Sequence, residues 1–167
     1  MPLPLGEVAA KPSERAIPET SNRTEVKPMT VFHSNSTAET ENFACELAKK
    51  INGGTVVALY GGLGMGKTAF TRGLARGLGN TSYVSSPTFA LVNDYGGSPQ
   101  LVHFDMYKVE SWEDLYSSGF FDYYDMGAVI CTEWSENIEN ALPENTVRVR
   151  LEKGEKENER IITVEGA

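Results

Sequence analysis

Three features of the sequence predict an α/β fold: a glycine-rich loop between a strand and a helix, a continuous apolar strand, and paired alternating segments. The loop, Gly61–Thr68, reads Gly-Gly-Leu-Gly-Met-Gly-Lys-Thr and satisfies the phosphate-binding pattern GxxxxGK[ST]. It follows the apolar run 55–60 and precedes a helical pattern at Phe70, Leu74 and Leu78. This order predicts a P-loop NTPase-like three-layer fold, whose mixed sheet has a parallel centre and antiparallel additions.

Each residue type in the loop suits the binding of phosphate groups. Glycine reaches positive φ without steric cost, so the backbone can wrap around an anion at Gly61, Gly62, Gly64 and Gly66. Lys67 supplies a cation for the β and γ phosphates, and the Thr68 hydroxyl can bind a Mg²⁺ ion that bridges them. The alternative is a glycine-rich turn that exposes a lysine.

The composition indicates a globular protein of 167 residues, enough for one domain with a core. No apolar stretch has transmembrane length and no secretory signal opens the chain, so we expect no membrane contact. Cys45 and Cys131 lack metal-ligand spacing and lie in apolar patterns, which favours buried free thiols and a reducing cytoplasm. The net charge of −8 makes direct RNA binding unfavourable, so a partner would hold any RNA.

Residues 1–29 differ from the rest and are expected to form a disordered, proline-rich N-terminal tail. They contain five of the eight prolines and no aromatic residue, and their acidic and basic residues cancel. The remaining residues, 30–167, are expected to form the one domain that contains the loop, with order beginning near Val31.

Capping and breaking residues locate the helices on either side of the loop. Ser36 as N-cap and Glu39 reaching back predict a capping box, and the helix that they begin should end at Gly53-Gly54. The helix after the loop should close at Gly79.

The second half of the chain predicts further strands and one short helix. Segments 89–92 and 101–107 predict an antiparallel hairpin around the turn 96–99. A second capping box at Ser111–Asp114 predicts a helix that ends at Gly119. A buried strand is expected at 128–132. A terminal hairpin is expected to follow it, with strands at 146–151 and 160–164.

Three residues are candidates to complete the site. Glu133 follows the buried strand, where open α/β sheets bind ligands and where Mg²⁺ requires a carboxylate. Asp105 interrupts an apolar strand, which is costly unless a cation or hydrogen bonds receive it. Thr88 lies where nucleotide switches place a sensing threonine. The alternatives are a surface strand end for Glu133, an exposed strand position for Asp105 and a plain turn for Thr88. His103 is expected to be structural.

These motifs together resemble those of the bacterial tRNA threonylcarbamoyladenosine biosynthesis ATPases of the TsaE family, also called YjeE. The resemblance covers roughly residues 31–151. The matching segments are the helix containing Thr40, Leu59–Thr68, Ser86–Phe89, His103–Lys108 and Glu133-Trp134. The loop is shared with many families, whereas the combination is specific.

The resemblance implies a Mg²⁺-dependent ATPase that acts with the TsaD and TsaB proteins in modifying tRNA, which it would reach through that complex. By matching position, Thr68, Glu133 and Asp105 would bind Mg²⁺, and Lys67, Thr88, Asp105 and Glu133 would be catalytic. The resemblance implies that ATP is bound by Gly61, Gly62, Leu63, Gly64, Met65, Gly66, Lys67, Thr68 and Ala69, with Thr37 and Thr40 near the base.

The chain departs from the family pattern at three positions. Lys108 stands where the family has arginine, which removes a planar bidentate donor. Gly62 and Met65 replace the family's aspartate and alanine, and both changes should be tolerated if the backbone binds the phosphates.

Two rival functions remain at this stage. A small-molecule kinase would need several arginines around its phosphates, and this chain has few. A GTP-dependent switch module would use the Asp-x-x-Gly match at 94–97, but the chain has no Asn-Lys-x-Asp segment. Because Arg72 and Arg76 are expected to point away from the γ-phosphate, hydrolysis by the isolated protein should be slow.

Overall fold

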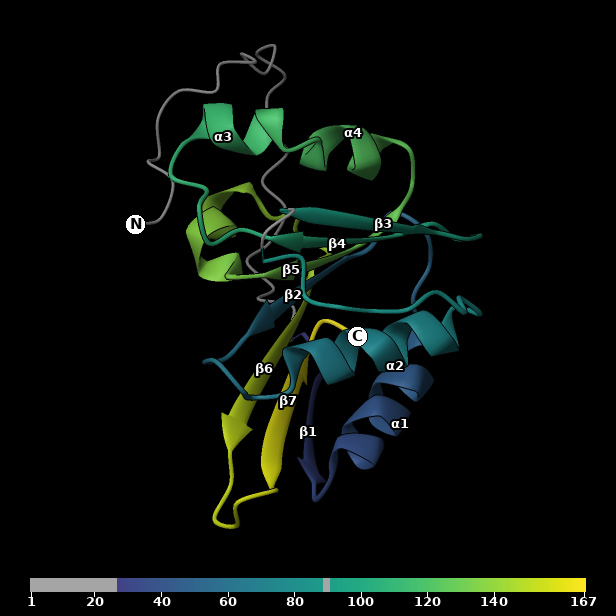
Figure 1. The fold of residues 1–167 in the computed structure, drawn as a ribbon, viewed down its shortest axis with the longest axis vertical. Helices are drawn as coiled ribbons and strands as arrows, with labels where there is room; N and C mark the ends of the chain where they lie inside the picture. The colour runs from purple at the N-terminus through teal and green to yellow at the C-terminus, as the bar shows by residue number, and fades with distance from the viewer. Residues whose placement is uncertain (1–26, 89–90) are drawn as a thin grey trace, which may run out of the picture.

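The computed structural model describes residues 27–88 and 91–167, which form a mixed sheet between two helical layers (Figure 1). The strands are β1 (Met29–Ser34), β2 (Val56–Tyr60), β3 (Val92–Gly96), β4 (Leu101–Asp105), β5 (Val129–Glu133), β6 (Val147–Lys153) and β7 (Arg160–Glu165). The helices are α1 (Thr37–Ala48), α2 (Lys67–Gly77), α3 (Trp112–Ser117), α4 (Phe120–Asp125) and the 3₁₀ helix η1 (Ser135–Ala141).

The sheet has the order β1-β7-β6-β2-β5-β4-β3. Its centre is parallel, because β2 pairs with both β5 and β6, and β5 pairs with β4. The outer pairs β3–β4, β6–β7 and β1–β7 are antiparallel. The predicted α/β fold, with a parallel centre and antiparallel additions, is therefore confirmed.

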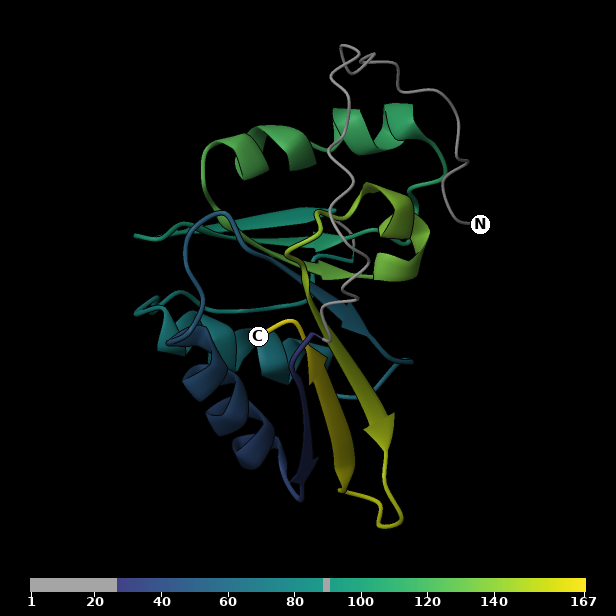
Figure 2. The same cartoon turned by 180° about the vertical axis from the view of Figure 1, so that it is seen from behind.

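Helices cover both faces of the central strands, as Figures 1 and 2 show from opposite sides. On one face, Val57 and Leu59 pack with Phe70 of α2. On the other face, Val56 packs in a second core with Phe120 of α4. Neighbouring residues of a strand point to opposite faces, so a strand covered on both sides must be apolar throughout. This explains the continuous apolar run before Glu133.

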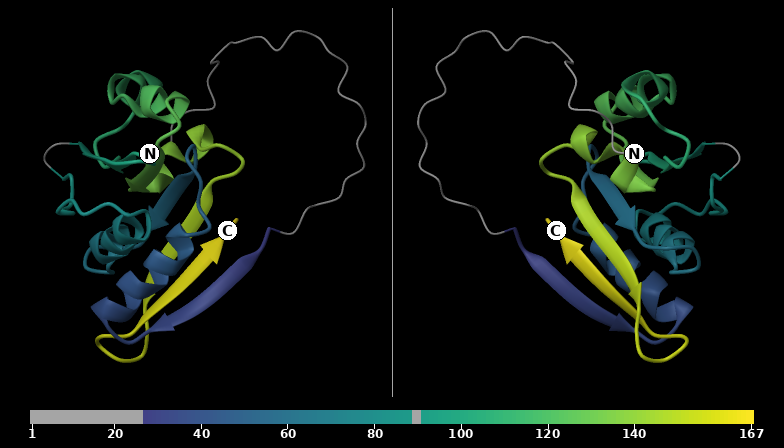
Figure 3. Two further views of the ribbon diagram at one scale, coloured as in Figure 1. Left: turned by 90° about the vertical axis from the view of Figure 1, so that its right-hand side faces the viewer. Right: turned by 90° about the vertical axis from the view of Figure 1, so that its left-hand side faces the viewer.

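The antiparallel strands at the far edge bring distant parts of the chain together (Figure 3). β1 pairs with β7 in a register that sets Ser34 opposite Arg160. The rings of Phe32 and Phe43 stack at 4.5 Å and fix α1 against β1. This edge places the start of α1 beside the start of β7, and both contribute to the site below.

Both predicted capping boxes are present, with one shift. Ser36 Oγ accepts from the Glu39 amide at 3.1 Å, but the Glu39 carboxylate accepts from the amide of Asn35 at 2.7 Å, one residue before the N-cap. Ser111 caps α3 in the same way, since its hydroxyl accepts from the amide of Asp114 at 3.1 Å.

Several boundaries differ from those expected. α1 ends at Ala48, and β1 begins at Met29, inside the range given to the tail. β4 ends at Asp105 because its carboxylate accepts the Tyr107 amide at 2.9 Å and turns the chain. α4 and η1 were not predicted. Residues 1–26, and Phe89 and Ala90 of the expected strand 89–92, lie outside the described residues.

Both cysteines are free, as expected, although Cys45 is only partly buried. Burial raises the pKa of the Cys131 thiol to about 12, which keeps it neutral. Within residues 27–88 and 91–167, none of the helices is long and apolar enough to cross a membrane.

Glycines in α2 allow it to pack closely against α1. A Cβ on Gly73 would lie 2.2 Å from the Glu41 carbonyl oxygen, and a Cβ on Gly77 would lie 2.3 Å from that of Cys45. Real Cβ atoms do not approach backbone oxygens so closely, so the two helices would have to separate.

We expect Gly73→Ala to destabilise the protein, although alanine normally favours a helix. The free energy of unfolding should fall by about 1–3 kcal/mol, because the added methyl group overpacks the helix interface. Urea denaturation measures it, with Gly62→Ala as the control, since a Cβ at Gly62 would contact nothing within 4 Å. An unchanged or higher unfolding free energy for Gly73→Ala would contradict the close packing.

Candidate active site

The loop between β2 and α2 is shaped by three glycines in positive φ. Gly61, Gly64 and Gly66 have φ values of 149°, 78° and 100°. A Cβ on Gly61 would also lie 2.6 Å from the Leu151 carbonyl oxygen of β6. Gly62 was also expected to use the freedom of glycine to reach positive φ, but its φ is not positive. A Cβ at Gly62 would contact nothing within 4 Å.

Lys67 begins α2 and extends back over the loop. Its ammonium group donates to the carbonyls of Gly61 at 2.6 Å and Gly62 at 3.1 Å, and it lies 6.0 Å from the centre of the Trp134 ring. An ammonium group has three donors, so one remains for an anion above the loop. The N-terminus of α2 adds its partial positive charge at the same place.

Asp105 and Glu133 lie side by side at the ends of two parallel strands. Asp105 is the last residue of β4, Glu133 is the last residue of β5, and the two are register partners. Their exposed fractions are only 4% and 5%. Burial raises the pKa of the Asp105 carboxyl above its ordinary value, and the charge of Glu133 raises it further, against the opposing hydrogen bond from Tyr107.

One cavity of about 550 Å³ joins the loop to these carboxylates. It is lined by Leu63, Gly64, Met65, Gly66, Lys67, Thr68, Ser86, Thr88, Asp105, Tyr107, Glu133 and Trp134. Thr88 lies within hydrogen-bonding distance of Ser86, with their hydroxyl oxygens 2.7 Å apart. The cavity therefore brings together every residue predicted to be catalytic or to bind metal.

Two exposed aromatic residues stand at the rim of this cavity. Tyr107 and Trp134 have ring centres 4.9 Å apart. Trp134 has a φ of 55°, a region that bulky residues rarely adopt, and this bend holds its ring near Lys67. Lys108 is exposed beside them and lines a surface hollow with Glu110. It does not line the phosphate cavity.

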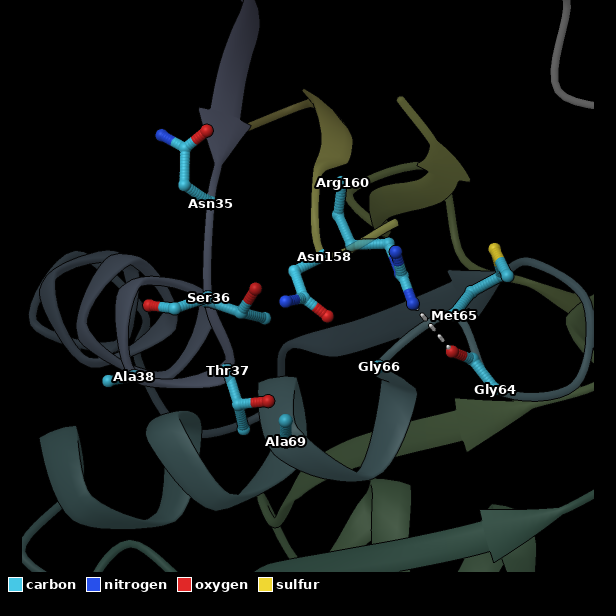
Figure 4. A pocket seen from close by; sticks show the side chains of 11 residues that line it. Asn35, Ser36, Thr37, Ala38, Gly64, Met65, Gly66, Ala69, Asn158 and Arg160 are labelled. Carbon is cyan, nitrogen blue, oxygen red and sulfur yellow. Dashed lines mark hydrogen bonds between the residues drawn. The ribbon is translucent and has the colours of Figure 1, made fainter. Parts of the chain in front are cut away.

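A second cavity, of about 430 Å³, borders the same loop, and Figure 4 shows the residues that line it. It is lined by Asn35, Ser36, Thr37, Ala38, Thr40, Gly64, Met65, Gly66, Ala69, Asn158 and Arg160. Thr37 lies at the exposed start of α1, whereas Thr40 is buried below it, with its hydroxyl oxygen 2.7 Å from that of Ser34. The two cavities share Gly64, Met65 and Gly66, so one elongated ligand could span both.

Arg160 connects the last hairpin to the loop, as the dashed line in Figure 4 shows. Its guanidinium group donates to the Gly64 carbonyl at 3.3 Å. It also donates to the carbonyls of Glu157 at 2.8 Å and Glu159 at 2.9 Å, which fix its position. No local sequence signal marks Arg160 or Asn158 as site residues, because the β6–β7 hairpin and the pairing of β6 with β2 bring them to the loop.

The arginines of α2 point toward α1. Arg72 pairs with Glu41 at 2.6 Å, and Arg76 donates to Asn42 at 2.6 Å. Asp94, the residue of the Asp-x-x-Gly match, lies in the hairpin and accepts from the amide of Gly96 at 2.9 Å. None of these three residues lines either cavity.

The donor set fits Mg²⁺ bound together with phosphate. Within the described parts of the chain, no group of three His, Cys, Asp or Glu side chains could hold a metal ion by itself. Mg²⁺ is usually bound by one or two carboxylates, waters and substrate phosphates, so a complete protein cage is not required. The adjacent buried carboxylates of Asp105 and Glu133 line the same cavity as Thr68, which suits such a shared site.

Comparison with known proteins gives the family. The model of the family described as "Threonylcarbamoyl adenosine biosynthesis protein TsaE" matches residues 34–162. The chain belongs to the TsaE family. The chain is 37% identical to "tRNA threonylcarbamoyladenosine biosynthesis protein TsaE" of Treponema pallidum, an alignment that covers 71% of this chain and 87% of the relative. It is 38% identical to the TsaE protein of Bacillus subtilis, over 77% of this chain and 81% of that protein.

A solved structure supports the same family. The chain superimposes on the crystal structure of YdiB from Bacillus subtilis with a TM-score of 0.70 and 30% identity. The superposition covers 83% of this chain and 86% of YdiB. The resemblance on which the motifs were matched is thus confirmed at the level of family and fold.

We expect Asp105→Asn to raise the thermal stability of the ligand-free protein at neutral pH. The folded state raises the pKa of Asp105, so ionising it costs folding free energy, and this cost grows as pH rises through the ordinary carboxyl range. The amide oxygen can still accept from Tyr107. The gain should be complete at neutral pH and vanish below about pH 4, where the carboxyl is protonated in both states.

Thermal unfolding in EDTA across this pH range checks the expectation. Asp125→Asn, at the exposed end of α4, removes the same charge and serves as the control. A melting temperature for Asp105→Asn at or below that of the wild type at neutral pH would show that the carboxylate is well solvated or paired.

Proposed function

We propose that this protein is a Mg²⁺-dependent cytoplasmic ATPase that acts with the TsaD and TsaB proteins in the threonylcarbamoyladenosine modification of tRNA. The observation that carries the ATPase is the single cavity that joins Lys67 and Thr68 to the carboxylates of Asp105 and Glu133. Membership of the TsaE family supports the pathway. The kinase and switch alternatives become outcomes of the tests below.

The loop would bind the phosphates of ATP. Three positive-φ glycines and the N-terminus of α2 would direct backbone N–H groups toward one anion, and Lys67 would add a full positive charge. The second cavity, between α1 and the last hairpin, would receive the ribose and base. Its amide side chains, Asn35 and Asn158, supply donors and acceptors that a purine edge could use.

The carboxylates would serve hydrolysis. Thr68 and Glu133 would hold Mg²⁺, which supplies neutralisation of the charge that develops on the phosphate oxygens. Asp105, buried and acceptor-only when ionised, would orient the attacking water toward the γ-phosphate, and Thr88 would contact that phosphate. No described arginine lines the phosphate cavity, so a group from a partner would complete the stabilisation of charge and speed the reaction.

The charge of the protein favours partners over direct RNA contact. A net charge of −8 disfavours a polyanion, so tRNA would be held by TsaD and TsaB. The exposed Tyr107 and Trp134 at the rim of the phosphate cavity, with Lys108 in the adjoining hollow, would let a partner sense whether ATP has been hydrolysed.

We expect Lys67→Ala to abolish ATP hydrolysis and to weaken ADP binding strongly. Glu133→Gln should lower kcat by about 100-fold while ADP affinity in EDTA stays within about threefold, because the carboxylate acts on metal and transition state. Phosphate release and calorimetric ADP titration measure the two effects. Glu136→Gln, exposed in η1, is the control.

Unchanged turnover in Glu133→Gln would remove that residue from the site. Phosphate transfer that depends on an added small-molecule acceptor would favour a kinase. A preference for GTP over ATP in competition would favour a GTP-dependent switch.

Reconstitution tests the role in the pathway. With TsaB, TsaD, threonylcarbamoyl donor, ATP and tRNA, multiple-turnover formation of threonylcarbamoyladenosine should require this protein and should fail with Lys67→Ala. Modification that proceeds equally without the protein would refute the pathway role and would leave the ATPase standing.

A further inference from the structure

His103 is a buried histidine to which the proposed chemistry gives no role. It lies in the middle of β4, has no exposed surface, and is two residues before Asp105, on the same face of the sheet. Its Nε2 atom has no hydrogen-bond partner among the described residues. A buried polar atom left unpaired costs about 1–3 kcal/mol, so this nitrogen requires an explanation.

The carboxylate of Glu133 approaches this nitrogen. The distance from His103 Nε2 to Glu133 Oε1 is 3.5 Å, slightly beyond a normal hydrogen bond. Since β4 and β5 are parallel neighbours, their backbones fix this approach. A small movement of the carboxylate would bring it into hydrogen-bonding distance of the ring.

Tyr95, on the neighbouring strand β3, holds the other side of the imidazole. Its hydroxyl oxygen lies 3.3 Å from His103 Nδ1. The same hydroxyl oxygen lies 2.9 Å from the Ser85 carbonyl oxygen and accepts from the Ser85 amide at 3.3 Å. Ser85 directly precedes Ser86, which lines the phosphate cavity with Thr88. Tyr95 therefore connects this segment to the histidine.

The direction of the hydrogen bonds decides what His103 can do. The Tyr95 hydroxyl has one hydrogen, so it donates either to the Ser85 carbonyl or to His103 Nδ1. When Nδ1 accepts, the neutral ring carries its hydrogen on Nε2 and directs it at the Glu133 carboxylate. The Ser85 carbonyl then keeps the Asn93 side-chain amide as a donor, at 3.1 Å. This arrangement gives His103 Nδ1 and the Ser85 carbonyl one donor each and directs Nε2–H at Glu133.

We propose that His103 is a positioning residue for Glu133. Tyr95 orients the imidazole, and Nε2–H holds the Glu133 carboxylate toward the metal side of the phosphate cavity. The chain Ser85–Tyr95–His103–Glu133 also ties the Ser86–Thr88 segment to the carboxylate. The inference rests on the proposed function, because it assumes that Glu133 binds metal with the nucleotide.

Four variants test it. Tyr95→Phe keeps the ring and removes the hydroxyl. His103→Leu removes both nitrogens, and His103→Gln returns one donor toward Glu133. Tyr123→Phe is the matched control, because Tyr123 packs on Phe104 in the opposite layer, with ring centres 6.0 Å apart.

Metal and nucleotide binding are measured separately. Electron paramagnetic resonance gives the affinity of the ADP-bound protein for Mn²⁺, and calorimetry in EDTA gives the affinity for ADP alone. His103→Leu and Tyr95→Phe should weaken Mn²⁺ binding by about 10-fold or more, the usual effect of losing a group that orients a metal ligand. ADP affinity in EDTA should stay within about twofold, and kcat should fall without a matching rise in KM. His103→Gln should recover most of the loss.

Equal Mn²⁺ affinity in the wild type, Tyr95→Phe and His103→Leu would overturn the proposal. A parallel fall of ADP affinity in EDTA would also overturn it, since that indicates a structural role only. If His103→Leu does not fold by circular dichroism, Tyr95→Phe decides by the same criteria. A wild type that neither binds Mn²⁺ with ADP nor hydrolyses ATP would refute the proposed function as well, whereas an active wild type with unaffected variants refutes this inference alone.

Discussion

The register between β4 and β5 is the constraint on which the candidate site depends. It sets Asp105 beside Glu133 at the same edge of the sheet, each almost without exposed surface. Two carboxylates in such a place repel each other and lose hydration, so the surrounding structure must supply positive charge. β2 lies next to β5, so the loop that follows it delivers Lys67 and the N-terminus of α2 to this edge. The order of the central strands thus assembles the phosphate half of the site.

The other half of the site depends on the antiparallel edge. β7 turns back along β6, β1 pairs with β7, and α1 starts where β1 ends. Arg160 reaches the loop from this edge, while the close packing of α1 on α2 at Gly73 keeps the start of α1 near Gly66. The loop therefore lies between two parts of the sheet: the parallel centre, which would face the phosphates of a ligand, and the antiparallel edge, which would face the remainder of that ligand.

The parts of the fold that follow from local sequence were predicted best. The loop Gly61–Thr68, both capping boxes and the buried strand before Glu133 carry their signals within a few residues, and all are present. The cavity also gathers the residues predicted to be catalytic, because parallel strands end at a common edge. Arg160, Asn158 and Tyr95 were assigned no role, since pairing between strands distant in sequence brings them to the site. The predicted end of α1 was also wrong: Gly53-Gly54 was expected to terminate the helix, whereas the helix ends at Ala48.

The position of β1 at the edge of the sheet has a consequence for how the protein responds to its ligand. Edge strands open most readily, because only one side is held by backbone hydrogen bonds. Asn35 and Ser36, which directly follow β1, line the cavity opposite Arg160. A ligand seated there would bridge the loop, the edge strand and the last hairpin, and its binding free energy would oppose fraying of that edge. Amide hydrogen exchange along β1 would then slow as nucleotide concentration rises, so the exchange rate of this edge strand would report how much of the site is occupied.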